Sequence, residues 1–287
     1  MQQKKMGILC MMVSVVLFSV MQLFVSLCSK SCGVFYPIFF RNLLGVFLCM
    51  SIIRKRKVSY FGNLKSQPYL MGRSFFGFLG VLFFFYATKH AMLADVSIVS
   101  RTGPFFTTIV AALFLHEKIS SIQIPVLSII FAGGLLVVDP SFDSSFIPLG
   151  AALLSAMCSG IVYPLLRYSR EREDAMTVIM HFSTFSVLAC IPFLIKDFSI
   201  PMGMDCIYLA LVAATGAFGQ IFLTYAYRLA PASEVAIYDQ FTIVCSIILG
   251  YLFLNQTPSR NSLIGGTMIV GASVFAYFYH TRRKIQK

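Results

Sequence analysis

Ten apolar segments, each close to 20 residues long, dominate the sequence and restrict the folds that it can adopt. A helix needs about 20 apolar residues to cross a bilayer. Because lipid offers the backbone no hydrogen-bond partner, each segment must be helical. Of all residues, 58% are hydrophobic and only 12% are charged, whereas about a quarter of the residues in a soluble domain are charged. We therefore expect an all-α integral membrane protein with ten transmembrane helices, at 6–29, 34–53, 68–88, 92–115, 121–138, 147–166, 175–195, 204–227, 232–254 and 261–280.

The basic residues are distributed unevenly between the two ends of these segments. With the N-terminus inside, sixteen Lys and Arg residues lie on the inner side and only four, Lys30, Lys89, Lys196 and Arg260, lie on the outer side. Basic loops stay in the cytoplasm. We therefore expect a bacterial cytoplasmic (inner) membrane protein with both termini cytoplasmic. The same bias accounts for the net charge of +12, so no nucleic-acid partner is expected.

The sequence repeats itself after 139 residues. The stretch YATKHAMLADVSIVSR (86–101) aligns without a gap with YAYRLAPASEVAIYDQ (225–240). With the same shift, LFLHEKIS (113–120) aligns with LFLNQTPS (252–259). The matching positions include charged and turn residues, which chance similarity between apolar helices does not explain.

The repeat predicts two five-helix halves, residues 1–143 and 144–287. Because five is an odd number, the second half enters the membrane from the opposite side. Such inverted repeats are typical of secondary transporters, whose substrate sites lie near the middle of the membrane where the repeats meet.

Motifs in both halves resemble the EamA-type branch of the drug/metabolite transporter superfamily. Ala94, Pro104 and Glu117 match a small residue at the start of the fourth span, a proline within it and a Glu after an apolar run. In the second half, Gln256 stands in place of the Glu. The resemblance implies a ten-helix carrier whose central cavity is lined mainly by spans 1–4 and 6–9. The stretches that carry it are FFRNLLGVF (39–47), 86–120 and 225–253.

Two charged residues are expected deep inside the fourth and ninth spans. At a rise of 1.5 Å per residue, Arg101 lies roughly 9 Å deeper than Asp95, and Asp239 lies roughly 7 to 8 Å deeper than Glu234. A charge in the hydrocarbon region is costly and usually functional. We expect Arg101 to bind an anionic group of the substrate, and Asp239 to bind a cationic group or a coupling proton. An internal salt bridge between the two spans is the alternative.

Five further ionisable residues are candidates for function within the expected spans. Asp95 and Glu234 are repeat equivalents near opposite ends of the membrane, and are candidates for gating or proton coupling. Arg41 is a candidate anion contact, or else extends to the interface. His181, its repeat equivalent at a shift of 140, is a candidate proton carrier or a packing residue. Arg73 is expected to extend to the cytoplasmic interface, with substrate contact as the alternative.

Uncharged residues complete the candidate site. Gln22, Tyr163 and Tyr238 are expected either to contact the substrate or to join neighbouring helices by hydrogen bonds. Gly103 and Pro104 are expected to kink the fourth span, because proline removes one backbone hydrogen bond. A local break exposes carbonyl groups at the depth where carriers bind substrate.

Sequence motifs exclude several other functions. The chain has no GxxxxGK[ST] loop, no HExxH and no GxSxG, which argues against ATP hydrolysis and against zinc or serine proteolysis. We expect no enzymatic activity, no cofactor and no metal. The expected partners are a small-molecule substrate, membrane lipid and protons.

The residues and the resemblance together predict a secondary-active transporter that works by alternating access. Because both signs of charge are expected in its cavity, we expect a small polar or zwitterionic, amino-acid-like solute. One alternative is an exchanger of a nucleoside-like metabolite such as S-adenosylmethionine. The other is a non-transporting membrane scaffold or lipid-handling protein.

Overall fold

The structure is a computed structural model that describes residues 2–28, 32–114, 123–138, 146–169, 172–196, 201–229 and 238–285. Helices joined by short connections make up these parts of the chain. The helices are α1 (Gln2–Leu27), α2 (Phe35–Arg56), η1 (Leu64–Ser66), α3 (Gln67–His90), α4 (Leu93–Ser100), α5 (Gly103–Phe114), α6 (Gln123–Val138), α7 (Phe146–Ser169), α8 (Ala175–Lys196), α9 (Met204–Leu229), α11 (Phe241–Leu254) and α12 (Arg260–Ile285).

The predicted all-α membrane fold is confirmed. Six of the described helices, α1, α2, α3, α7, α8 and α9, are each long and apolar enough to cross a membrane. Helices α6 and α11 are apolar but shorter. The fourth expected span, predicted as one helix over 92–115, consists instead of α4 and α5. From first to tenth, the expected spans thus contain α1, α2, α3, α4 with α5, α6, α7, α8, α9, α11 and α12.

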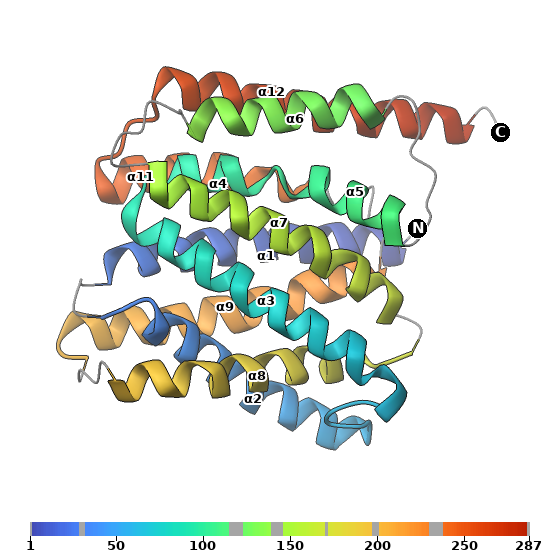
Figure 1. The fold of residues 1–287 in the computed structure, drawn as a ribbon, viewed down its shortest axis with the longest axis vertical. Coiled ribbons are helices and arrows are strands. Elements are labelled where there is room, and N and C mark those ends of the chain that lie inside the picture. Colours follow the sequence, from blue (N-terminus) through green and yellow to red (C-terminus); the bar gives the residue numbers. More distant parts are fainter. Residues whose placement is uncertain are drawn as a thin grey trace.

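The start of α1 and the end of α12 lie at the same end of the bundle (Figure 1). An even number of crossings returns the chain to this end. We call it the inner end, and the opposite end the outer end, after the expected orientation. That the inner end faces the cytoplasm remains a prediction from the basic residues.

The two five-helix repeats interlock instead of packing as separate units. Helix α1 packs most extensively against α9, and its repeat equivalent α7 packs against α3. Helices α2 and α8 form one edge pair, and α6 and α12 form the other (Figure 1). Two helix groups result, which we call the α3 group (α3, α4, α5 and α7) and the α1 group (α1, α9 and α11). Each group takes helices from both halves of the chain.

A pair of buried hydrogen bonds follows the same repeat. Ser14 Oγ of α1 donates to the carbonyl oxygen of Gly219 in α9, at 2.9 Å. Ser155 Oγ of α7 donates to the carbonyl oxygen of Gly80 in α3, at 2.8 Å. Most other hydroxyl groups of the helices bond to a carbonyl one turn earlier on their own helix, as in Thr88 to Phe84. Such a bond satisfies the hydroxyl group within its own helix, so no neighbouring helix is needed. The bonds that cross between helices therefore mark specific contacts.

Helices α6 and α12 approach each other closely at two glycines. A Cβ atom on Gly265 would lie 2.5 Å from the carbonyl oxygen of Gly133, and one on Gly133 would lie 2.9 Å from that of Gly265. Small residues at helix contacts allow such close approach in membranes. Gly271, farther along α12, has no heavy atom within 4 Å of the position of a Cβ atom.

We predict that Gly265→Ala destabilises the protein and that Gly271→Ala does not. The added methyl group at Gly265 must push α6 and α12 apart, and overpacking of this kind costs about 1–3 kcal/mol. The free energy of unfolding, measured for the purified protein in detergent, checks this. Equal stability of the two variants would contradict the close helix contact.

Candidate functional site

The chain leaves helical geometry between α4 and α5. The amide of Arg101 bonds to the carbonyl oxygen of Ile98 at 3.0 Å, and that of Thr102 bonds to Val99 at 3.1 Å, so the chain tightens into three-residue turns. Pro104 is the second residue of α5 and has no N–H. Its ring would clash with the carbonyl of Ser100 in a continuous helix. The break therefore falls at Arg101 and Thr102, directly before Gly103 and Pro104.

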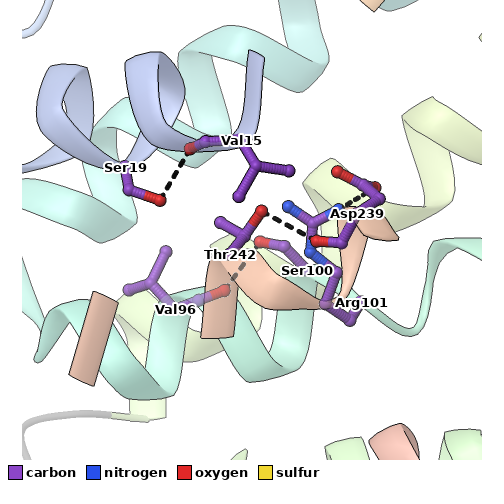
Figure 2. A network of polar contacts seen from close by, with 7 residues as sticks. All are labelled: Val15, Ser19, Val96, Ser100, Arg101, Asp239 and Thr242. Atoms are coloured by element: carbon purple, nitrogen blue, oxygen red, sulfur yellow. Dashed lines mark hydrogen bonds and ion pairs between the residues drawn. The ribbon is translucent and has the colours of Figure 1, made fainter. Parts of the chain in front are cut away.

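Arg101 forms an ion pair with Asp239, which lies directly before α11 (Figure 2). Their side chains are 19% and 21% exposed, so the pair is only partly buried. The carbonyl oxygen of Asp239 accepts a hydrogen bond from Thr242 Oγ1 at 2.8 Å. Figure 2 also shows Ser100 of α4 beside the pair. The pair thus joins the α3 group to the α1 group.

A cluster of three buried polar side chains joins α1, α4 and α11. Ser97 Oγ lies 2.6 Å from Ser246 Oγ. Both hydroxyl groups lie 3.1 Å from Oε1 of Gln22. The side chains of all three residues are about 1% exposed. The amide nitrogen of Gln22 has no hydrogen-bond partner in the described part of the chain. Ser97 of α4 is one turn before Arg101, so the cluster that holds this donor is joined to the helix that leads to the ion pair.

Arg41 is buried in the bundle and does not extend to the interface. Its side chain is 6% exposed, and its Nη2 donates to Oε1 of Gln220 at 3.3 Å. The guanidinium carbon lies 5.9 Å from the ring centres of both Phe18 and Phe85. Gly216 gives it room, because a Cβ atom there would lie 2.7 Å from Cγ of Arg41.

A small cavity adjoins Arg41. It measures about 10 Å³ and is bounded by α2, α8 and α9, with Asn42, Phe182 and Ser183 among its walls. This volume holds about one water molecule.

The expectation that Arg73 extends to the cytoplasmic interface is wrong. Its side chain is only 4% exposed, and its guanidinium carbon lies 4.0 Å from the ring centre of Phe182 in α8. The reason is the contact with this ring, which attracts the guanidinium group towards α8 and away from the interface. Gly77, one turn after Arg73, leaves space for the ring of Phe182. In the segment between α2 and α3, the amide of Asn63 donates to Oε1 of Glu173 at 2.9 Å.

The two tyrosine candidates lie in different surroundings. Tyr163 of α7 is within electrostatic range of Arg73, Arg101 and Asp239, and its side chain is 37% exposed. Its electrostatic surroundings therefore include both the ion pair and Arg73. Tyr238 instead packs against an apolar cluster on α1 and α9 that includes Cys10, Met11, Val15 and Ala226.

The structure does not bring Asp95 and His181 to the ion pair. Asp95, near the outer end, accepts a hydrogen bond from Ser262 Oγ of α12. His181 Nδ1 lies 2.8 Å from Ser74 Oγ, and its Nε2 lies 3.3 Å from Gln67 Oε1. Both ring nitrogens therefore face polar atoms of α3. Glu234 lies outside the described residues.

A ten-helix bundle of two inverted repeats, with a partly buried ion pair where its helix groups meet, is typical of a membrane carrier. The comparison with known families agrees, because the sequence pattern of the EamA-like transporter family matches residues 5–139 and 147–278. The chain belongs to this family of carriers, and not to an enzyme family.

Several transport proteins are similar to most of this chain. The pseudopaline exporter CntI of Pseudomonas aeruginosa is 29% identical over 272 residues, which cover 94% of this chain and 95% of the relative. Solute carrier family 35 member G1 of Mus musculus is 28% identical, and the match covers 93% of this chain and 76% of the relative. A riboflavin transporter of Brucella anthropi is 28% identical, and the match covers 68% of this chain and 71% of the relative.

A solved crystal structure shares the fold of this chain. Its TM-score is 0.62 at 18% sequence identity, and the match covers 96% of this chain and 99% of the other.

We predict that Arg101 and Asp239 stabilise the fold as a pair. In a double-mutant cycle of Arg101→Gln and Asp239→Asn, each single variant leaves a charge in the bundle without its partner. The coupling energy should therefore be about 1–3 kcal/mol. Thermal or denaturant unfolding of the four proteins in detergent measures it.

A second cycle, Arg56→Gln with Asp174→Asn, is the matched control. These side chains are 42% and 21% exposed and lie 3.8 Å apart, and an exposed ion pair contributes at most about 1 kcal/mol. If the effects of the Arg101 and Asp239 substitutions on the free energy of unfolding are additive, the pair does not stabilise the fold and the prediction is wrong.

Proposed function

We propose that the protein is a secondary carrier of a small zwitterionic, amino-acid-like solute in a bacterial cytoplasmic membrane. The Arg101–Asp239 ion pair at the break between α4 and α5 carries this proposal. A carboxylate of the solute binds Arg101, and its ammonium group binds Asp239. The internal pair is thus exchanged for two pairs with the solute, so neither charge is left without a partner in the membrane.

The neighbouring polar residues complete this site. The free amide nitrogen of Gln22 donates to the solute, and the exposed ring of Tyr163 borders it on the side of Arg73. One relative is named as a pseudopaline exporter and another as a riboflavin transporter. Since those names point to different solutes, the proposed substrate class rests on the charges of this site.

Transport follows from relative movement of the two helix groups. Arg101 belongs to the α3 group and Asp239 to the α1 group, so a solute held between them couples to both. The halves 1–143 and 144–287 contribute helices to each group, and for this reason we propose movement between the groups and not between the halves. Packing supports this choice, because α1 with α9 and α3 with α7 form the most extensive helix pairs.

Contacts at both ends of the bundle are the proposed gates. At the inner end, Asn63 bonds to Glu173 and Arg56 pairs with Asp174. At the outer end, Ser262 bonds to Asp95, and the amide of Leu93 donates to Oε1 of Gln256 at 3.0 Å. Of these contacts, Leu93–Gln256 joins α4 of the α3 group to the segment that follows α11 of the α1 group. In this proposal Asp95 controls the outer gate and is a site for proton coupling.

Two further residues complete the proposed gating. Glu234, the repeat equivalent of Asp95, takes the corresponding role at the inner end. His181 links α3 and α8 near the inner gate, and is the second proposed site for proton coupling.

We predict that a zwitterionic amino acid raises the midpoint of thermal unfolding of the purified protein. A solute at 100 times its dissociation constant stabilises a protein by about 2.7 kcal/mol. A screen of amino acids, nucleosides and cationic drugs measures this shift in the wild type and in Arg101→Ala, each against its own baseline. The same amino acid should not stabilise Arg101→Ala.

Two outcomes of this screen would contradict the proposal. Stabilisation by a nucleoside alone would favour the exchanger of nucleoside-like metabolites. Equal stabilisation of wild type and Arg101→Ala by the amino acid would remove Arg101 from the site.

A further inference from the structure

Two buried arginines remain that the proposed function does not use. Within the described residues, no carboxylate forms an ion pair with Arg41 or Arg73. The charges of Arg101 and Asp239 cancel, whereas the positive charges of Arg41 and Arg73 have no ion-pair partner among the described residues. An unpaired charge in a low-dielectric interior is costly.

The protein provides only weak compensation for these charges. Arg41 has the amide oxygen of Gln220 and two aromatic rings, and Arg73 has the ring of Phe182. Nε and Nη1 of Arg73 are buried and have no hydrogen-bond partner in the described part of the chain. An aromatic ring attracts a cation but accepts no strong hydrogen bond in the plane of a guanidinium group. The buried donors of Arg73 therefore lack an acceptor.

The two arginines are close neighbours. The ring that lies against Arg73, Phe182, also forms part of the wall of the cavity beside Arg41. The positive charge of Arg41 acts electrostatically on Arg73. Arg73 in turn is within electrostatic range of Tyr163, which also interacts with Arg101 and Asp239.

We propose that Arg41 and Arg73 form an anion subsite, and that the carried solute is a net-negative amino acid with an additional carboxylate. This inference rests on the proposed carrier function. The solute binds Asp239 and Arg101 with its amino-acid group, as above. Its additional carboxylate binds Arg73 and Arg41, because a guanidinium fork matches the two oxygens of a carboxylate.

The arrangement of helices gives this subsite a role in transport. Arg73 belongs to the α3 group. Arg41 lies on α2 and contacts α1 and α9 of the α1 group through Phe18, Gly216 and Gln220. An anionic group between the two arginines joins both groups and reduces the repulsion between them. The additional carboxylate therefore favours the arrangement in which the two helix groups lie close together.

The test compares two amino acids that differ in one charge. L-Glutamate and L-glutamine have nearly the same shape, and their binding to the purified full-length protein is measured by thermal unfolding over a range of concentrations. In the wild type, L-glutamate should bind at least about tenfold more tightly than L-glutamine. Arg73→Gln should remove this preference and leave the affinity for L-glutamine nearly unchanged.

Further variants separate the subsite from a structural role. Arg41→Gln should also remove the preference, and it serves as the test if Arg73→Gln does not fold. Arg54→Gln, an exposed position on the same helix as Arg41, should keep the wild-type preference. A merely structural role of Arg73 predicts a lower unfolding midpoint with the preference for L-glutamate retained, and that result would overturn the subsite.

The remaining outcomes distinguish this inference from the proposed function. Equal affinity of the wild type for the two amino acids would overturn the subsite and leave the zwitterion carrier intact. If neither amino acid binds the wild type, amino-acid carriage fails and the subsite fails with it. Inorganic phosphate is the third probe, and binding of phosphate alone in an Arg73-dependent manner would assign the arginines to a free anion and overturn the amino-acid subsite.

Discussion

A charge inside the membrane needs a partner, and the arrangement around Arg101 and Asp239 depends on this constraint. The cost of one unpaired ion in the hydrocarbon region exceeds the contribution of most single contacts in the fold. The break between α4 and α5 places Arg101 opposite the start of α11, and Asp239 lies there to meet it. The two residues therefore tie the two helix groups together by an ion pair.

The repeat explains why the pair lies at the centre of the protein. With the shift of 139, Asp239 corresponds to Ser100 and Arg101 corresponds to Gln240. Each charged residue is thus the sequence neighbour of its partner's equivalent, so the pair lies close to the axis that relates the two repeats. The framework keeps the repeat symmetry, as the bonds from Ser14 and Ser155 show. The polar residues do not keep this symmetry.

Much of the fold could be predicted from the sequence, because lipid restricts the backbone to helices that span the membrane. The spans, the repeat and the family follow from apolar length and from aligned residues. Arg101 and Asp239 were identified as candidates, and their direct pairing was one of two stated alternatives. The burial of Arg73 and the apolar surroundings of Tyr238 could not be predicted. Both depend on neighbours that are distant in sequence, namely Phe182 of α8 and the packing of α1 against α9.

The central claim is that the ion pair borders a space that water reaches from each side of the membrane in turn. Labelling of Ser100→Cys with a membrane-impermeant thiol reagent, in a background without native cysteines, tests it most directly. Ser100 adjoins the pair (Figure 2), and its substitution leaves both charges in place. Val16→Cys, at the middle of α1 and 50% exposed on the bundle surface, is the lipid-facing control. We predict labelling of Ser100→Cys from both sides of sealed vesicles and of Val16→Cys from neither. If Ser100→Cys is labelled from neither side, the pair has only a structural role, and the proposed carrier site is contradicted.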